Sequence, residues 1–218
     1  MILTPIAAHE LPVLAAGLTA NLRAPLAVSA LRRILASGPS RAVGARAGIH
    51  RQAAIRLGRA LGIPIRDGAP GRNFGWDGRW LRGRTEAYVL LHEIAHHRLA
   101  GGNRRRRREF GLGPGPETGH RFAAERAATL GGPAREREEA MASLLGILLE
   151  VELGQPALAS FLDQNWLEGA ERPGAAAHFE RVLRRLARAG LVSRDGRPVL
   201  STPTARRYSD RLLKRIDI

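Results

Sequence analysis

The chain has 218 residues, no cysteine, and a net charge of +15 from 35 basic and 20 acidic residues. This length suits one domain of ordinary size, and the lack of cysteine excludes disulfides, thiolate metal sites and a cysteine nucleophile. The longest apolar segment, residues 140–149, is far shorter than the about 20 residues that cross a bilayer, and the first residues lack a basic signal-peptide region. We therefore expect a cytoplasmic protein with no membrane partner.

The positive charge is concentrated at the two ends of the chain. Residues 1–80 carry 11 basic and 3 acidic residues, residues 81–170 carry 12 of each, and residues 171–218 carry 12 basic and 5 acidic residues. Because Lys214 is the only lysine, a genome that favours arginine codons explains part of the excess, so the distribution is more informative than the total. It predicts that any DNA contact is made by the basic ends.

Apolar periodicity predicts a mainly helical chain with a small sheet. Pro12 and Pro25 start helices within 11–37, and Gly48 with Ile49 interrupts a helical pattern over 41–61. The other predicted elements are short strands at 62–65 and 79–81, helices at 85–99, 122–130, 134–153, 156–166 and 175–189, and an arginine-rich loop at 101–119. After these come a tight turn at 194–197, a strand at 198–202 and a basic helix that reaches Ile216.

The segment His92-Glu93-Ile94-Ala95-His96 is an H-E-x-x-H motif inside the predicted helix 85–99. Two histidines four positions apart lie about 40° from each other around a helix, so both imidazoles can reach one Zn²⁺. Glu93, beside them, is placed to accept a proton from an attacking water. The alternative is a histidine-rich helix face without metal, but the apolar residues before the motif favour a buried helix that carries a zinc site.

A catalytic zinc needs a third protein ligand and one open position. Glu139, near the start of the predicted helix 134–153, is the first candidate, because a carboxylate on a largely buried helix needs a positive partner. Glu138, His120 and Glu117 are the alternatives. Ser143, one turn after Glu139, is a candidate to orient a ligating histidine.

Four segments extend this pattern: Leu90-Leu91-His92-Glu93-Ile94-Ala95-His96-His97, Arg108-Glu109-Phe110-Gly111, Glu138-Glu139-Ala140-Met141-Ala142-Ser143-Leu144-Leu145 and Glu152-Leu153-Gly154. Together they resemble the zincin-type metallopeptidase domain of ArdC-type antirestriction proteins, over about residues 85–167. The resemblance implies a zinc peptidase with His92, His96 and Glu139 as ligands and Glu93 as base. Two departures are an insertion at about 112–135 and Ser143, where the family has a glutamate. The motif's helical surroundings are also similar to ImmA-like regulatory proteases, whose targets are repressors.

Residues 171–218 resemble the last half of a winged-helix domain, with an amphipathic helix, a tight turn, a strand and a basic helix. This resemblance implies that Arg194 and Arg197 lie in a wing against DNA phosphates. Residues 40–61 are a second candidate, as a helix-turn-helix with Gly48 and Ile49 in the turn. Structural packing of both ends onto the rest of the chain is the alternative.

The sequence therefore predicts three parts: a basic helical region at 1–62, a zincin-like helical core with a small sheet at 63–170, and a winged-helix-like module at 171–218. The predicted function is zinc-dependent hydrolysis of a peptide bond in a protein or peptide, with DNA association in an antirestriction or regulatory role. The alternative is a DNA-binding regulator that retains a non-catalytic zincin scaffold.

Overall fold

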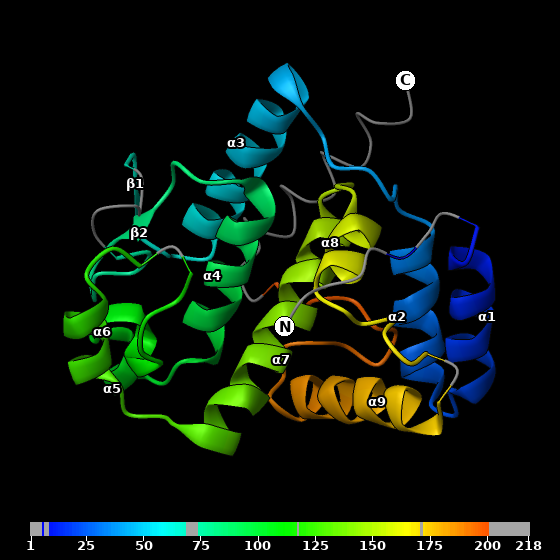
Figure 1. Cartoon of the computed structure of the whole chain (residues 1–218). Coiled ribbons are helices and arrows are strands. Elements are labelled where there is room, and N and C mark those ends of the chain that lie inside the picture. The colour runs from blue at the N-terminus through cyan, green and yellow to red at the C-terminus, as the bar shows by residue number, and fades with distance from the viewer. Residues whose placement is uncertain (1–5, 7–8, 69–73, 117, 171, 201–218) are drawn as a thin grey trace.

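The computed structural model describes residues 6, 9–68, 74–116, 118–170 and 172–200. The fold is mainly helical with one two-stranded sheet, as predicted (Figure 1). Its elements are α1 (Leu11–Asn21), α2 (Pro25–Leu35), α3 (Gly44–Ala60), β1 (Ile65–Arg66), β2 (Leu81–Arg82), α4 (Ala87–Leu99), α5 (Gly102–Arg105), the 3-10 turn η1 (Arg108–Gly111), α6 (Arg121–Ala127), α7 (Gly132–Glu152), α8 (Ala157–Asp163) and α9 (Pro173–Arg188). Among the described residues, no helix is both long and apolar enough to cross a membrane.

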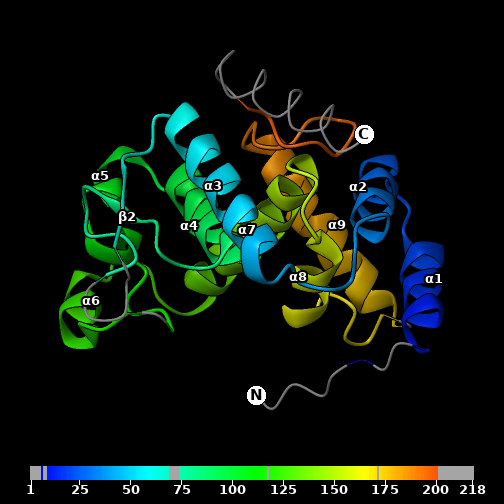
Figure 2. The same ribbon diagram turned by 90° about the horizontal axis from the view of Figure 1, so that it is seen from above.

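Helix α7 lies at the centre of the molecule, between α4 on one side and α2 and α9 on the other (Figure 1 and Figure 2). The segment 144–149 of α7 is apolar on every side, since Leu144, Leu145, Ile147, Leu148 and Leu149 are all fully buried. A helix that is apolar all round is stable only inside a protein, so the other helices pack around this one.

One hydrophobic core joins the three predicted parts. Leu31 of the amino-terminal region, Leu91 of the middle and Leu183 of the carboxyl-terminal region all belong to the same buried cluster. The described residues of the basic ends therefore pack onto the middle of the chain. This burial supplies the apolar contact that stabilises α1, α2 and α9.

The pair α4 and α7 comes unusually close at one glycine. A Cβ atom on Gly146 would lie 3.2 Å from the Cα of His92, so any larger residue would push the helices apart. Residues later in α4 contact residues earlier in α7: His92 lies next to Gly146, and His96 lies next to Glu138. The two helices therefore run antiparallel, which brings the first half of α7 beside the end of α4.

The observed helix boundaries follow proline more closely than glycine. The predicted helical stretch 11–37 is divided into two helices because Ala24 is held extended before Pro25, which starts α2. The predicted break at Gly48 and Ile49 is wrong, since α3 runs without interruption from Gly44 to Ala60. A single glycine costs a helix only about 1 kcal/mol, and burial of Leu57 against the core offsets it. The helix-turn-helix predicted with its turn at this point is therefore also wrong.

The short strands are two residues long and overlap only the last residue of each predicted range, at Ile65–Arg66 and Leu81–Arg82. They pair in parallel, Ile65 with Leu81 and Arg66 with Arg82. Trp76 also forms an antiparallel bridge with Leu81, so the segment between the strands folds back along β2. The Trp76 ring of this segment lies against His97 of α4, with ring centroids 5.1 Å apart, so the segment contacts the helix directly after the H-E-x-x-H motif. Figure 1 shows the small sheet on the same side of the molecule as α4.

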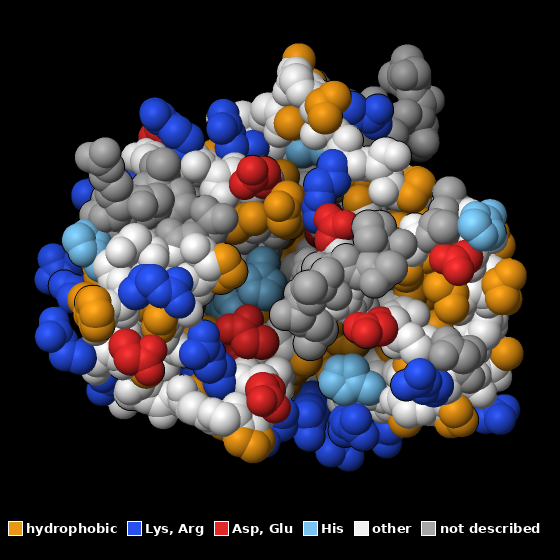
Figure 3. All heavy atoms as spheres, in the orientation of Figure 1, with side chains coloured by type: hydrophobic (Ala, Val, Ile, Leu, Met, Phe, Trp, Pro, Cys, Tyr) orange, Lys and Arg blue, Asp and Glu red, His pale blue; other side chains and the backbone are white. Residues whose placement is uncertain are grey.

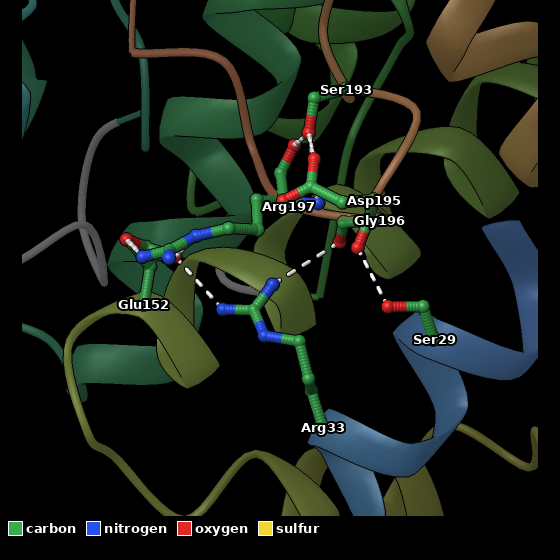
Figure 4. A network of polar contacts seen from close by, with 7 residues as sticks. All are labelled: Ser29, Arg33, Glu152, Ser193, Asp195, Gly196 and Arg197. Atoms are coloured by element: carbon green, nitrogen blue, oxygen red, sulfur yellow. Dashed lines mark hydrogen bonds and ion pairs between the residues drawn. The ribbon is translucent and has the colours of Figure 1, made fainter.

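The predicted tight turn at 194–197 is present, closed by an antiparallel bridge between Val192 and Pro198. It lies flat against α2. Ser29 Oγ donates to the carbonyl of Asp195 at 2.8 Å, and a Cβ on Gly196 would lie only 3.0 Å from the backbone nitrogen of Ala30 (Figure 4). The predicted helix that ends at Ile216 and the last residues of the predicted strand, 201–202, lie outside the described residues.

Arg197, assigned above to a DNA-binding wing, is used within the protein. Its guanidinium pairs with Glu152 at the end of α7, and Arg33 of α2 reaches the same carboxylate at 2.9 Å (Figure 4). The Glu152 side chain is only 5% exposed. Arg194 of the same turn is exposed. Arg197 therefore anchors the turn to the helical core, and Arg194 is the arginine that faces solvent.

Candidate metal centre

Three side chains from α4 and α7 place their donor atoms in one small triangle. His96 Nε2 lies 3.0 Å from His92 Nε2, and Glu139 Oε2 lies 3.5 Å from His92 Nε2 and 3.3 Å from His96 Nε2. Around a tetrahedral Zn²⁺ with bonds of 2.0–2.1 Å, two ligand atoms lie about 3.3 Å apart. Two imidazole nitrogens and one carboxylate oxygen are also a donor set found in catalytic zinc sites. The residues present therefore fit this ion.

The local sequence explains how the triangle forms. Buried Leu91, Ile94 and Ala95 fix one face of α4 in the core, which turns the two histidines toward α7. The close approach at Gly146 then brings Glu139, two turns earlier on α7, within reach of both rings. The three residues singled out from the sequence are thus the three that the fold brings together.

Glu138 lies outside the triangle, on the Nδ1 side of the His96 ring. Its carboxylate accepts hydrogen bonds of 2.6 and 2.7 Å from Arg104, and its Oε1 lies 3.7 Å from His96 Nδ1. Nδ1 of His96 is buried and has no hydrogen bond at this distance. An acidic partner behind a metal-binding histidine fixes the ring and its tautomer. Glu138 is therefore placed to orient His96 and is not one of the three donors of the triangle.

The other two alternatives for the third ligand have separate outcomes. The His120 ring lies against Phe74, with centroids 5.5 Å apart, and His120 is not part of the donor cluster formed by the described residues. Glu117 lies outside the described residues. Ser143, expected to orient a histidine, instead accepts a hydrogen bond of 2.8 Å from the Trp166 indole.

The charges in the triangle are tightly coupled. Burial lowers the pKa of His92 and outweighs the neighbouring Glu139, which raises it. Burial also lowers the pKa of His96, but Glu138 and Glu139 outweigh it and raise that pKa to about 9. Burial raises the pKa of Glu139, but the two histidines outweigh burial and hold this pKa well below its usual range. The two carboxylates therefore favour the protonated form of His96, and a metal ion that binds its Nε2 must displace the proton there.

A cavity of about 400 Å³ lies beside the triangle, on the side where a fourth metal ligand would bind. Glu93, Tyr88 and Gln164 line it together with the three donor residues. Figure 3 shows histidine and acidic side chains at the bottom of a hollow near the centre of this face. The predicted base and the predicted ligands therefore share one accessible space.

Glu109 also lines this cavity, although no functional role was predicted for it from the sequence. Its buried carboxylate accepts hydrogen bonds from the backbone N–H of Gly75 at 2.9 Å and of Trp76 at 3.3 Å, and from the Thr118 hydroxyl at 2.7 Å. Burial raises its pKa, although these hydrogen bonds lower it. Glu109 thus holds the segment at Gly75 and Trp76 along the cavity wall.

The backbone at Glu109 is strained. Glu109 and Phe110 have φ angles of 45° and 52°, a region that non-glycine residues rarely enter. Phe110 is fully buried between Trp76, with ring centroids 5.2 Å apart, and His96, with centroids 5.9 Å apart. These contacts hold the strained turn, whose one sequence signal is an acid and a Phe-Gly pair directly after five arginines.

No protein-family model, no curated protein and no solved structure matches this chain. The resemblance to ArdC-type antirestriction proteins therefore stays a prediction.

Proposed function

We propose that the protein is a zinc-dependent peptidase that hydrolyses a peptide bond in a protein or peptide. The observation that supports this most strongly is the triangle of His92, His96 and Glu139 donor atoms, open to a cavity that also contains Glu93. In an H-E-x-x-H site the glutamate between the histidines is the general base. The chain therefore offers a metal site, a base and an access route in one place.

Each residue has a definite role in this proposal. His92, His96 and Glu139 hold Zn²⁺, which when bound supplies a Lewis acid that polarises the scissile carbonyl. The Glu93 carboxylate accepts a proton from the attacking water and returns it to the leaving amine. Tyr88, on the cavity wall, is the candidate hydrogen-bond donor to the developing oxyanion.

The test is the substitution Glu93→Gln, which removes the base but none of the ligands. We expect zinc content to stay at about one ion per chain while peptide hydrolysis falls by about 10³-fold, within the usual range for loss of a general base. Elemental mass spectrometry measures the first quantity and cleavage of a peptide library measures the second. Glu136→Gln is a matched control, since Glu136 is exposed on α7, and it should leave both unchanged. Hydrolysis that survives Glu93→Gln at the wild-type rate would contradict the proposal.

One observation favours the second candidate, a DNA-binding regulator with a non-catalytic scaffold. Arg181, Arg184 and Arg188 recur on the exposed face of α9 at helical spacing. Such a row of guanidinium groups suits a phosphate backbone. In that case DNA binding persists in Glu93→Gln, weakens when α9 loses these arginines, and accounts for the biological effect. An antirestriction or regulatory role is compatible with either candidate.

A further inference from the structure

Two hollows lie next to the metal cavity on the surface. Tyr88 lines both the metal cavity and a first hollow of about 620 Å³, next to α3 and the start of α4. Arg41 and His50 line both the first hollow and a second one of about 620 Å³. We call these two hollows the basic groove.

The walls of the basic groove carry more positive than negative charge. Five arginines contribute to it: Arg33, Arg41, Arg46, Arg51 and Arg84. Its acidic residues are Glu86 and Glu150. Glu150 is 2% exposed, and burial raises its pKa to about 7, so it bears only part of a negative charge at neutral pH. Among the residues that line the groove, positive side chains therefore outnumber negative ones.

Arg41 is held in a fixed position where the groove meets Tyr88. Its guanidinium stacks on the Tyr88 ring, 3.5 Å from the centroid, and donates to Asp163 at 2.7 and 3.0 Å and to Ser160 at 3.2 Å. Ordering this side chain in advance reduces the entropy that binding must remove. Arg41 and Tyr88 thus form a rigid wall between the metal cavity and the groove.

Arg46 and Arg51, both on α3, have no hydrogen bond or ion pair with any residue that the structure describes. The other arginines of the groove are engaged: Arg33 with Glu152, Arg41 with Asp163 and Arg84 with Asp67. Val43, 81% exposed on the wall of the second hollow, adds an apolar contact next to Arg46. The groove thus presents two unengaged cations and an apolar side chain to a ligand.

The opposite end of the metal cavity differs in charge. A hollow of about 380 Å³ that also reaches His92 and Glu139 is lined by Glu168, Gln164 and His178, and none of its described lining residues is arginine or lysine. The wall of the metal cavity itself includes Arg135. Beyond that cavity, a chain lying across the metal centre would meet arginines in the basic groove and none among the described lining residues of the hollow at His178. Charge complementarity of this kind selects ligands more than it adds affinity.

We infer that the basic groove binds an acidic, partly apolar segment of a polypeptide substrate, on the Tyr88 side of the bond that is cleaved. That the bound segment belongs to a substrate rests on the proposed peptidase function. The binding of an acidic polypeptide segment to the groove is a separate claim, and it is measured without cleavage.

The experiment uses the full-length Glu93→Gln protein, so that a bound peptide is not consumed. Fluorescence anisotropy compares a short labelled peptide rich in Asp, Glu and Leu with the same peptide carrying Asn and Gln instead. At an ionic strength of about 0.15 M we expect the acidic peptide to bind about tenfold more tightly. Arg46→Gln with Arg51→Gln should abolish this preference, and thermal unfolding checks that the variant stays folded.

The matched control is Arg32→Gln with Arg126→Gln, which removes the same charge from exposed positions on α2 and α6 that line none of these hollows. It should change peptide affinity by less than about twofold. Equal losses in the two double variants, or no preference for the acidic peptide, would overturn the inference. So would a single-stranded oligonucleotide that displaces the peptide and depends on Arg46 and Arg51.

The cleavage assay separates this inference from the proposed function. Groove-dependent binding of the acidic peptide together with its cleavage by the wild-type protein supports both. Groove-dependent binding without cleavage of any peptide supports the acidic ligand and contradicts the peptidase.

Discussion

The two ends of α7 use glutamate in opposite ways. Near its end, Glu152 is buried and neutralised by two arginines, Arg33 and Arg197. Near its start, Glu139 faces two histidine rings, and no described arginine pairs with it. In a chain with 34 arginines and one lysine, a cation for a carboxylate is easy to provide.

This difference shows how structure and function are divided along one helix. The arginines at Glu152 tie the carboxyl-terminal turn to α2 and α7, so that carboxylate stabilises the fold. Near the start of α7, Arg104 pairs with Glu138, and Glu139 faces the histidines. The comparison predicts that changes at Glu139 affect metal binding and that changes at Glu152 affect stability.

The largest effect is expected from Glu139→Ala. Loss of one of three protein ligands should weaken zinc binding by about 10³-fold or more, or roughly 4 kcal/mol. Competition with a fluorescent zinc chelator measures this change, and His96→Ala should lose zinc to a similar degree. His120→Ala should keep the wild-type affinity. If Glu139→Ala keeps zinc and His120→Ala loses it, the third ligand is His120, directly before α6. The contrast between Glu139 and Glu152 would then not hold.

The sequence predicted the grouping of His92, His96 and Glu139 better than it predicted the surrounding structure. Helical spacing pairs the two histidines, and the cost of a buried carboxylate made Glu139 the first of four candidates for the third ligand; both are local rules. The helix start at Pro25 also follows from a local rule. These predictions needed no knowledge of which elements pack together.

Other features depend on contacts between distant parts of the chain. Gly48 reads as a break, but packing of α3 on the core keeps the helix continuous. Glu109 enters the site only because a strained turn places Phe110 between Trp76 and His96. The basic groove combines residues that lie far apart in the chain, such as Arg51 and Glu150. Such features follow from the packing of the whole fold.

Glu150 provides a test of intermediate size on the same helix. It is buried without a paired arginine of its own, and burial raises its pKa from 4.5 to about 7, although Ser160 and Arg41 lower it. Between these values the unfolded chain loses the proton while the folded chain keeps it. The free energy of unfolding should therefore fall as pH rises from 4.5 to about 7, by roughly 3 kcal/mol at most, and change no further above that range.

Urea unfolding of the wild type and Glu150→Gln at several pH values measures this contribution. Glutamine does not titrate, so the difference between the two proteins should shift in favour of Glu150→Gln as pH rises. A chelator in the buffer keeps metal binding out of the comparison. A difference that stays constant from pH 4.5 to 8 would show that Glu150 ionises normally and that its burial carries no penalty.

A smaller effect is expected from Glu152→Gln, because both arginines remain partly in water. Removing one partner of a fully buried ion pair costs about 3–5 kcal/mol. Here the Arg33 and Arg197 side chains are 25% and 44% exposed, so a loss of about 2 kcal/mol is the reasonable expectation. Urea unfolding measures the loss, and zinc content should stay the same as in the wild type.

Arg197→Gln sharpens this last prediction. Arg33 still neutralises Glu152 in that variant, so stability should fall by less than about 1 kcal/mol. Two equal losses would mean that the carboxylate contributes only through Arg197. Zinc lost from Glu152→Gln while the protein stays folded would mean that the two ends of α7 are coupled. In that case the arginines at one end would help to position Glu139 at the other, and the division between a structural and a functional carboxylate would not hold.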